Sequence, residues 1–563
     1  MAQAVPTGAG ANPWHRSYPD GIPHAMTPSS YTSVADLIET NFPAFAARPA
    51  FSCMGKSMSY ATLAADTAAF ASFLQSLGLK KGDRIALMMP NILPFPVALA
   101  GALRAGLIVV NVNPLYTPRE LEHQLIDSGA KAIVVLENFA HVLEQVVART
   151  DVEHVVVTRM GDMLGPKGVL VNAVVRHVRK LVPAWRLPGH HRFSRTISVG
   201  RGFDRPKLTP DDIAFLQYTG GTTGVAKGAI LTHGNILSNL QQNRHWAEVA
   251  YNARGRPEQI TFICALPLYH IFALAVNALT AWDQGGHNIL IPNPRDIPAL
   301  VKDLGRHRWH FFAGLNTLFN ALLSNDDFRK LDFSPVKLVM SGGMALQRAT
   351  AERWKDVTGA DIYEGYGLSE TSPVATANRF DAIGFTGTVG LPMPSTEIAI
   401  RDEDGNDLPV GNAGEVCIRG PQVMKGYWNR PHETAASMTA DGYFKTGDIG
   451  TLDQAGFLRI VDRKKDMIIV SGFNVYPNEI EEVAAGHPDV IESAAIAVPD
   501  DKTGEAVKLF VVRRIPTLTE ADLRKHCAAH LTNYKRPRFI EFRDDLPKSP
   551  VGKILRRELR DAG

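Results

Sequence analysis

Glycine, threonine and lysine gather in one short segment of the chain, Tyr218–Gly228, which reads YTGGTTGVAKG. Glycines let backbone N–H groups turn toward an anion without a Cβ in the way, and threonine hydroxyls and a lysine add further donors. Val225 and Ala226 separate Gly224 from Lys227, so the segment does not have the Walker A spacing. We interpret it as a phosphate-binding loop of another kind, with a chance Gly/Thr loop as the alternative.

A carboxylate between two hydroxyls marks a second segment, YEGYGLSETSP at 363–373. Mg²⁺ prefers carboxylate oxygens together with phosphate oxygens of a substrate, so Glu370, flanked by Ser369 and Thr371, is a candidate ligand. Tyr366 offers a flat face for a purine. An N-cap followed by a surface glutamate is the structural alternative.

Two further segments each contribute one charged side chain. Asp448 follows a Thr-Gly turn in YFKTGDIG (443–450), where its carboxylate could accept both hydroxyls of a ribose, although Asp and Gly are also ordinary turn residues. Lys553 lies in PKSPVGKILRREL (547–559), between a Pro/Gly loop and a basic helix start, where a solvated basic face is the alternative.

The elements that must position these segments alternate between short β-branched runs and longer helical patterns. Strands are predicted at 84–89, 107–112, 132–136 and 154–158, with helical spacing of apolar residues at 96–106 and 118–130. This alternation predicts α/β units with largely parallel sheets. Residues 161–207 are basic and lack a strand pattern, and we expect a helix and a surface loop there. Their part 180–193 could lie on an anionic membrane surface or be a solvated loop.

Composition places the 563-residue chain among globular enzymes with more than one domain. Hydrophobic residues make up 45% and charged residues 21%, which argues against a disordered or fibrous chain. Lys and Arg number 60 against 57 Asp and Glu, and the resulting net charge of +3 gives no reason to expect nucleic acid as a partner.

The cysteine pattern and the hydropathy of the chain indicate in which cellular compartment the protein is expected. The four cysteines are scattered singly with no CxxC, which favours buried thiols in a reducing cytosol over disulfides or a zinc site. The first 23 residues show no secretory signal and predict a flexible arm. The most apolar region, 85–110, is interrupted by prolines and by Arg104 and falls short of a membrane-spanning helix. A peripheral membrane contact remains open.

In their joint order, these segments resemble the adenylate-forming superfamily of acyl-CoA synthetases, luciferases and peptide-synthetase adenylation domains. LPLYHIFAL (266–274), SGGMAL (341–346) and DRKKDMIIVSGFNVYPNEIE (462–481) stand between them in the same order as in that family. The resemblance covers residues 30–560, and the motifs are specific as a set. Within the superfamily the chain is most similar to bacterial long-chain fatty acid–CoA ligases.

The resemblance implies a multidomain α/β fold. We expect a flexible arm (1–30), a large N-terminal AMP-binding domain (31–462), a hinge (463–466) and a small, mobile α+β C-terminal domain (467–563). The large domain would consist of α/β subdomains with mostly parallel sheets plus a β-barrel-like part. The dense charge cluster DRKKD, between the apolar runs FLRIV and MIIV, supports a boundary there independently.

The resemblance also implies roles for single residues. The phosphate loop would hold the β- and γ-phosphates of ATP through Tyr218, Thr219, Gly220, Gly221, Thr222, Thr223, Gly224 and Lys227. Ser369 or Thr371 would touch the α-phosphate, the adenine would lie among Gly343, Glu364, Gly365 and Tyr366, and the ribose hydroxyls would be held by Asp448 and Arg463.

Catalysis would rest on Lys553, Glu370, Thr222 and His270. Lys553 would bridge the acyl carboxylate and the α-phosphate, and Glu370, helped by Thr219, would ligate Mg²⁺. A lone histidine is more often structural, but His270 would line the acyl and CoA passage. Lys465 matches the hinge position and Gly472 the CoA passage, and the acyl pocket would include His270, Asn316, Thr317, Gly342 and Gly367.

The implied reaction has two steps: ATP and an acid give an acyl-adenylate and pyrophosphate, and the thiol of CoA then displaces AMP. The implied small molecules are ATP, Mg²⁺, CoA and a fatty acid, in a cytoplasmic enzyme that could contact the inner face of the cell membrane. A homodimer stays open. The apolar stretches 266–282 and 316–323 fit a fatty-acyl tunnel but would also pass as core helices.

Three other functions compete with this one. A fatty acyl-AMP ligase would stop at the adenylate, but family members of that type usually carry an insertion before the hinge, and GDIGTLDQAGFLRIVDRKKD runs through without one. A medium-chain or aryl acid–CoA ligase would differ in its acid. A non-catalytic nucleotide- or fatty-acid-binding protein would not need Lys553 and Glu370.

Overall fold

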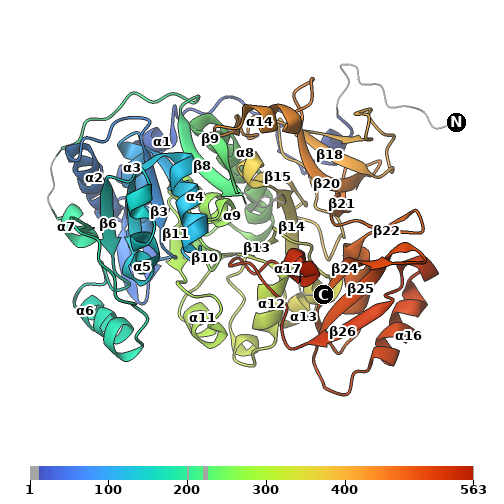
Figure 1. Ribbon diagram of the computed structural model, residues 1–563. Helices are drawn as coiled ribbons and strands as arrows, with labels where there is room; N and C mark the ends of the chain where they lie inside the picture. Colours follow the sequence, from blue (N-terminus) through green and yellow to red (C-terminus); the bar gives the residue numbers. More distant parts are fainter. Residues whose placement is uncertain (1–11, 199–201, 220–225, 562–563) are drawn as a thin grey trace.

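Two large, mostly parallel sheets form the N-terminal part of the protein, and a smaller α+β unit follows it (Figure 1). The computed structural model describes residues 12–198, 202–219 and 226–561. One large cluster of buried apolar side chains joins both sheets with the helices between them, among them Leu37, Phe70, Leu99, Phe215 and Trp246. The α/β class expected from the alternating sequence pattern is confirmed.

The first sheet has nine strands. Their order is β16 (Leu391–Pro392), β15 (Val374–Ala377), β14 (Ile362–Gly367), β13 (Leu338–Ser341), β12 (Phe311–Gly314), β10 (Thr261–Cys264), β11 (His287–Leu290), β1 (Pro49–Cys53) and β2 (Lys56–Ser59). The strands from β14 to β1 pair in parallel, whereas the edge strands β15, β16 and β2 are antiparallel.

The second sheet has eight strands. Their order is β19 (Gly426–Tyr427), β9 (Lys227–Thr232), β8 (Ile213–Thr219), β4 (Ile108–Asn111), β3 (Arg84–Met88), β5 (Ala130–Leu136), β6 (His154–Thr158) and β7 (His191–Arg192). Pairing is parallel from β8 to β7 and antiparallel where β9 joins β8 and β19. The strands expected at 84–89, 107–112, 132–136 and 154–158 are thus β3, β4, β5 and β6.

Helices cover both sheets. The helices of the large part are α1 (Val34–Ala44), α2 (Tyr60–Ser76), α3 (Pro94–Arg104), α4 (Pro118–Ser128), α5 (Ala140–Glu144), α6 (Pro166–Ala173), α7 (Phe193–Thr196), α8 (His233–Arg254), α9 (Ile271–Ala273), α10 (Thr280–Gln284), α11 (Ile297–Leu304), α12 (Asn316–Leu323), α13 (Arg348–Thr358) and α14 (Pro431–Ser437). All of α3 is buried, including Arg104, which pairs with Glu39 at 2.6 Å. The apolar run 85–110 is therefore a buried strand–helix–strand unit.

Local sequence signals fix the helix ends. Thr117 and Glu120 form a reciprocal capping box at the start of α4, and Gly129 ends that helix in the left-handed region at φ 60°. Because Thr232 caps α8 in the same way through Asn235, the chain turns from β9 directly into a long helix. In the part of the chain that the structure describes, no helix combines the length and the apolar character needed to span a membrane.

An antiparallel sheet of four strands follows the two large sheets: β17 (Glu397–Arg401), β18 (Gly414–Arg419), β20 (Phe444–Leu452) and β21 (Leu458–Arg463). The resemblance implied that the large domain contains a β-barrel-like part, and this antiparallel sheet shows that the expectation is wrong. Among the described residues its end strands β17 and β21 do not pair, so the sheet stays open. One face is covered by a small apolar cluster around Ile398, Val416 and Leu458.

The C-terminal unit is a five-stranded sheet with helices on both faces. Its strands are β22 (Ile468–Val470), β23 (Phe473–Val475), β24 (Val490–Asp500), β25 (Gly504–Arg513) and β26 (Phe539–Arg543). The helices α15 (Pro477–Ala485) and α16 (Glu520–His530) pack on one face, and α17 (Arg556–Asp561) packs on the other. The α+β class expected for the C-terminal unit is confirmed.

Candidate active site

The candidate site residues follow the carboxyl ends of parallel strands. His270 comes after β10, Thr317 after β12, Gly342 after β13, and Glu370 after β14. Ligands of open α/β sheets bind at this edge, because the loops that follow the strands gather there. The phosphate loop leaves the end of β8 in the other sheet. Both large sheets therefore contribute to the site.

The two ends of the phosphate loop are held by strand pairing. Thr219 and Lys227 face each other across the β8–β9 hairpin. Lys227 forms an ion pair with Glu433 of α14, and the hydroxyl of Tyr218 donates a 2.7 Å hydrogen bond to Asp127. The predicted loop residues Gly220, Gly221, Thr222, Thr223 and Gly224 lie outside the described residues.

Glu370 is a buried carboxylate beside the phosphate-loop hairpin. Tyr427 donates a 2.8 Å hydrogen bond to its Oε1, and its backbone carbonyl accepts from Met424 at 2.7 Å. Burial raises the pKa of Glu370. The alternative of a surface glutamate after an N-cap is therefore wrong. Within the described residues the side-chain partner of Glu370 is the hydroxyl of Tyr427 and not a cation, and a buried carboxylate of this kind is suited to receive one.

The hydroxyls on either side of Glu370 differ in their use. Thr371 is fully buried, accepts a 2.9 Å hydrogen bond from the backbone N–H of Leu368, and donates to the Leu368 carbonyl at 3.1 Å. Its hydroxyl therefore holds the turn after β14. Ser369 is half-buried, and its hydroxyl has no hydrogen-bond partner among the described residues. Of the two hydroxyls, it is therefore the better placed to meet a phosphate.

A second buried carboxylate, Glu364, lies on β14. Its Oε1 accepts from the N–H of Leu346 at 3.3 Å, and burial raises its pKa to about 8. Gly343 has φ 81°, a conformation that favours glycine, and a Cβ on Gly342 would come within 3.0 Å of Phe272. Among the predicted adenine residues, the backbone of Gly365 comes close to a neighbouring strand, because a Cβ there would lie 3.3 Å from the carbonyl oxygen of Thr376.

Asp448 joins three of the predicted motifs. It lies within strand β20, opposite Arg463 of β21, so the alternative of an ordinary turn is wrong. Its Oδ2 accepts from the hydroxyl of Tyr366 at 2.6 Å, and its Oδ1 pairs with Arg463 Nε at 2.9 Å. Because its side chain is 4% exposed, the carboxylate is fixed between an aromatic ring and a cation.

Lys553 reaches this cluster from the C-terminal unit. A tight turn holds it, with its N–H bonded to Ser549 Oγ at 3.1 Å and its carbonyl accepting from the Ser549 N–H at 2.7 Å. Thr317 Oγ1 of the large part donates a 3.0 Å hydrogen bond to the carbonyl of Gly552. Burial and, to a smaller extent, the positive charge of Arg463 together lower the pKa of Lys553 to about 8. The alternative of a solvated basic face is wrong.

Arg556 fixes the start of α17 beside the Lys553 turn. It pairs with Glu481 at 2.8 Å, with Asp462 at 3.3 Å and with Asp466 at 3.5 Å. These three carboxylates come from β21, from the turn after it and from α15. The Lys553 turn is thereby held at the junction of the antiparallel sheet and the C-terminal unit.

His270 is neutral at physiological pH. It caps α9, with Nδ1 accepting from the N–H of Phe272 at 3.3 Å. Burial and, to a smaller extent, the nearby positive charge of Lys553 together lower its pKa to about 4. His270 therefore lies close to Lys553 and has a capping role, in line with the structural alternative for a lone histidine.

The structure assigns support roles to three of the predicted acyl-pocket residues. Asn316 Nδ2 donates a 3.0 Å hydrogen bond to Gln347 Oε1, and the backbone N–H of Gln347 donates a 3.1 Å hydrogen bond to Asn316 Oδ1. This pair of bonds ties α12 to the start of α13. Thr317 holds the Lys553 turn. A Cβ on Gly367 would meet the Pro373 carbonyl at 1.7 Å, so this glycine permits the close approach of β14 to the segment that follows it.

An apolar cavity that the sequence did not predict as such lies between α8 and the nine-stranded sheet. Its volume is about 30 Å³, and its lining includes Trp246, Tyr251, Val276, Met340, Ala377 and Phe380. Val276 belongs to the apolar stretch 266–282 that was a tunnel candidate. The other candidate stretch, 316–323, is core instead, because Phe319, Leu322 and Leu323 pack in a separate buried cluster around Trp354.

The predicted hinge and CoA-passage residues lie outside this cluster. Lys465 is exposed in the turn between β21 and β22, and partial desolvation of its ammonium lowers its pKa. Gly472 is exposed in the β22–β23 turn at φ 83°, and no atom lies within 4 Å of where its Cβ would be. The arrangement of the two units that the structure describes thus brings Lys553 to the site and leaves Gly472 in solvent.

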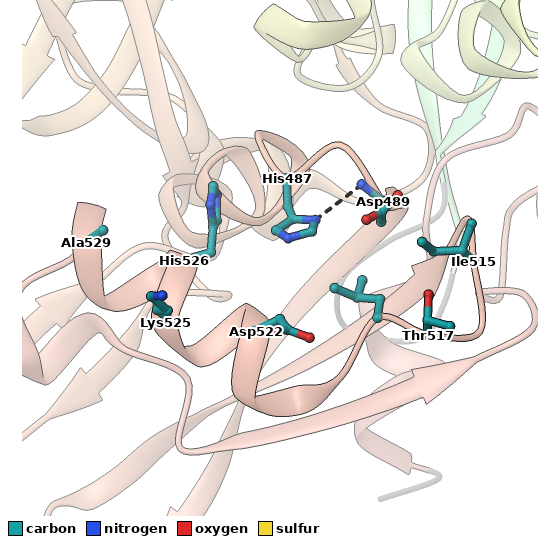
Figure 2. A pocket seen from close by; sticks show the side chains of 9 residues that line it. His487, Asp489, Ile515, Thr517, Asp522, Lys525, His526 and Ala529 are labelled. Carbon is teal, nitrogen blue, oxygen red and sulfur yellow. Dashed lines mark hydrogen bonds between the residues drawn. The ribbon is translucent and has the colours of Figure 1, made fainter.

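A hollow on the C-terminal unit is separate from the candidate site. Figure 2 shows its lining, with His487 and Asp489 from the end of α15 and Asp522, Lys525 and His526 from α16. His487 Nδ1 accepts from the N–H of Asp489 at 3.2 Å. In the described ranges no three His, Cys, Asp or Glu side chains are placed to hold a metal ion, in this hollow or elsewhere.

Comparisons with known proteins agree with this geometry. The family model for the AMP-binding enzyme matches residues 38–428, and the model for the C-terminal domain of that enzyme matches residues 479–553. A Yersinia pestis protein described as a long-chain-fatty-acid–CoA ligase is 55% identical over 97% of each chain.

Solved structures give the same result. An anthranilate CoA ligase, AuaEII, in complex with anthranoyl-AMP, has a TM-score of 0.84 at 26% identity, covering 95% of this chain and 98% of its own. ATP-bound MatB from Rhodopseudomonas palustris has a TM-score of 0.76 at 29% identity, and the match covers 94% of this chain and 98% of the MatB chain.

Proposed function

Because the chain belongs to the AMP-binding enzyme family, we propose that it is a long-chain fatty acid–CoA ligase. In the first half-reaction a fatty-acid carboxylate attacks the α-phosphorus of ATP, giving acyl-adenylate and pyrophosphate. In the second, the thiol of CoA attacks the acyl carbon and AMP leaves. One observation carries the proposal: a half-buried lysine from the C-terminal unit is held near the ion pair between Arg463 and the buried Asp448.

The first half-reaction depends on position and charge. Negative charge shifts onto the pyrophosphate as the bond breaks, so the site must hold donors and cations where that charge develops. Lys553 would contact both the incoming carboxylate and the α-phosphate, while Lys227 would meet the departing phosphates. To do so, Lys227 would leave its ion pair with Glu433.

The nucleotide would lie along the cluster that joins Glu364 to Asp448. Asp448 would accept the ribose hydroxyls, with Arg463 holding the carboxylate in place. Tyr366, whose hydroxyl is already bonded to Asp448, would present its ring to the adenine. The buried Glu364 would lie beside the base together with Gly343 and Gly365.

Glu370 fits the Mg²⁺ that this chemistry uses. Mg²⁺ is commonly held by one or two carboxylates together with substrate phosphates rather than by an all-protein cage. A single buried carboxylate, bonded to Tyr427 through one oxygen, matches that pattern. The bound ion neutralises charge on the phosphates, and Glu370 with Thr219 would position it.

A change in the relative position of the two units would separate the half-reactions. We place the large domain at 31–462, the hinge at 463–466 and the small domain at 467–563, with 1–30 as the arm. Lys465 lies in the turn between a strand of the large part and the first strand of the small sheet. Movement there would withdraw Lys553 and let the exposed Gly472 approach the acyl-adenylate with the CoA chain.

Two assays separate this function from its alternatives. Pyrophosphate release from ATP in the presence of palmitate, followed by formation of a CoA thioester, is the expected result. Release without thioester would instead identify a fatty acyl-AMP ligase, and no release with any acid would identify a binding protein. The kcat/KM values for a series of aliphatic and aryl acids test the substrate class. The highest value for palmitate would exclude a medium-chain or aryl acid–CoA ligase.

The first half-reaction should be pH-dependent through Lys553. Its pKa is lowered to about 8, so the ammonium is lost as the pH rises through that value. We expect kcat/KM for ATP in adenylation to fall about tenfold from pH 7 to pH 9, since this parameter reports groups of the free enzyme. A Lys553→Arg variant, whose guanidinium stays charged, should lack this fall. An unchanged profile for both proteins would contradict the role of Lys553.

The apolar cavity should set the preferred chain length. At about 30 Å³ it is far smaller than an acyl chain, so side chains around Val276 must move to admit one. We expect Val276→Phe to lower kcat/KM for palmitate about tenfold while changing that for octanoate less than about threefold. Val301→Phe is the matched control, because Val301 is equally buried, at 4%, in the other apolar cluster. Equal losses for both acids would rule the cavity out.

We further propose that the enzyme acts in the cytoplasm and contacts the inner face of the cell membrane peripherally. Its substrate is an apolar chain that partitions into bilayers, which favours a protein that collects it there. A homodimer is compatible with these roles, and light scattering would settle the oligomeric state.

A further inference from the structure

Helix α6 packs one apolar side chain, Val171, against the large buried cluster, is otherwise attached by polar groups, and leaves several apolar side chains in solvent. Val169 and Leu170 are 75% and 66% exposed, and Val178 and Leu181 further along are 72% and 57% exposed. The helix continues as a wider π-helical turn, η4 (Val174–Val178), and Gly168 is its only buried residue in that span. This is the reverse of an ordinary surface helix, whose apolar stripe faces the core.

Hydrogen bonds and one ion pair attach this segment. The N–H of Gly161 donates to Asn172 Oδ1 at 2.7 Å, and Asn138 Nδ2 donates to the carbonyl of Leu181 at 2.9 Å. Arg176 pairs with Glu137, a carboxylate buried to 1% exposure. The orientation of the helix is therefore fixed by its polar side, and the apolar side is held outward.

Three of the apolar residues, Leu170, Val174 and Val178, are spaced by four residues along α6 and η4, the spacing that aligns side chains along a helix. Leu181 follows in the segment after η4 and is also exposed. Val174 is half-exposed and completes the stripe. Figure 1 shows α6 at the lower left edge of the large part, far from the C-terminal unit in red, so the small domain leaves this face open.

The charge of the segment is one-sided. Residues 166–198 contain seven Lys and Arg and no Asp or Glu. The rest of the chain has 53 Lys and Arg against 57 Asp and Glu, a net charge of −4, so this segment alone makes the protein positive overall. Arg179 and Lys180 follow the apolar stripe directly and are exposed, without an ion-pair partner among the described residues.

We propose that α6, η4 and Arg179–Leu181 form a docking surface for an anionic lipid bilayer. The apolar stripe would enter the boundary between headgroups and acyl chains, and the exposed cations would meet lipid phosphates. Charge complementarity selects this occupant, because an apolar protein partner would not require an acid-free segment. The surface gives a location to the peripheral contact proposed above, on α6 and η4 rather than mainly on 180–193.

Co-sedimentation with vesicles tests the docking surface without ATP, acid or CoA, so its result does not depend on the proposed catalytic function. We expect the protein to bind phosphatidylcholine vesicles that contain about 30% phosphatidylglycerol at least about tenfold more tightly than pure phosphatidylcholine vesicles. The double variant Leu170→Gln/Val178→Gln should weaken the binding at least about tenfold, because it removes apolar contact area. The double variant Arg179→Gln/Lys180→Gln should weaken it about thirtyfold, because it removes two charges. Added salt should abolish the difference between the parent protein and the charge variant, but not the difference between the parent protein and the apolar variant.

The matched control replaces two apolar residues exposed elsewhere. Ile383→Gln/Val410→Gln changes side chains that are 85% and 38% exposed on other loops and should leave vesicle binding unchanged. Unchanged melting temperatures would show that all variants fold. Equal vesicle binding by all variants would overturn the proposal. So would a dimer that Leu170→Gln/Val178→Gln converts to monomer, because the face would then join two copies of the chain.

Discussion

Replacing Lys553 with alanine should lower the rate of acyl-adenylate formation by about a thousandfold and leave thioester formation from a preformed acyl-adenylate nearly unchanged. The Lys553 side chain is half-buried near Asp448 and Arg463, where its ammonium would meet charge that develops only in the first step. Pyrophosphate release measures that step, and transfer of the acyl group from synthetic acyl-adenylate to CoA measures the second.

A lysine in the same segment provides the control. Lys548 pairs with Glu492 at 2.8 Å, within the C-terminal unit, and does not join the cluster around Asp448. Lys548→Ala should therefore leave both half-reactions within about threefold of the parent rate. An equal loss of both half-reactions in Lys553→Ala would show that Lys553 supports the fold or a shared step rather than adenylation.

The second large effect is expected for Glu370→Gln. The amide keeps the shape of the side chain and an oxygen that can accept from Tyr427, but it loses the negative charge that would hold Mg²⁺. We expect adenylation to fall about a hundredfold and the Mg²⁺ concentration for half-maximal rate to rise, since a carbonyl oxygen is a weaker ligand than a carboxylate. Pyrophosphate release across a Mg²⁺ titration measures both.

Glu397 is a matched control for that substitution. It also accepts a hydrogen bond from a tyrosine hydroxyl, from Tyr443 at 2.7 Å, but it lies in the open antiparallel sheet and pairs with Arg419. Glu397→Gln should leave the Mg²⁺ dependence unaltered. If the two variants changed it equally, Glu370 would not be the metal ligand.

The sequence alone predicts the α/β class and the order of the motifs, because both depend on local patterns. The alternation of β-branched runs with helical spacing identifies β3, β4, β5 and β6, and glycine-rich or charged segments stand out against their apolar surroundings. What each motif does was ambiguous. Asp448 looks like a turn residue until β20 and β21 pair, and Glu370 looks exposed until Tyr427, 57 residues away, covers it.

The acyl cavity shows a second reason why the site could not be predicted in full from the sequence. An apolar side chain that faces a cavity and one that faces the core have the same periodicity, so 266–282 and 316–323 could not be told apart. Packing separates them: Val276 lines the cavity, whereas Phe319 packs on Trp354. Trp246 and Met340 could not be found by motif, because they reach the cavity from α8 and β13, segments without any residue pattern of their own.

The Lys553 turn is attached to the large part through its main chain. Thr317 Oγ1 donates to the Gly552 carbonyl at 3.0 Å, and Arg295 Nη2 lies 3.5 Å from the Ser549 carbonyl. Neither bond uses a side chain of the turn, and each contributes only about 1 kcal/mol net. The residence time of the lysine at the reaction centre can thus be tuned in evolution by exchanging Thr317 or Arg295, without altering any group that acts on the substrate.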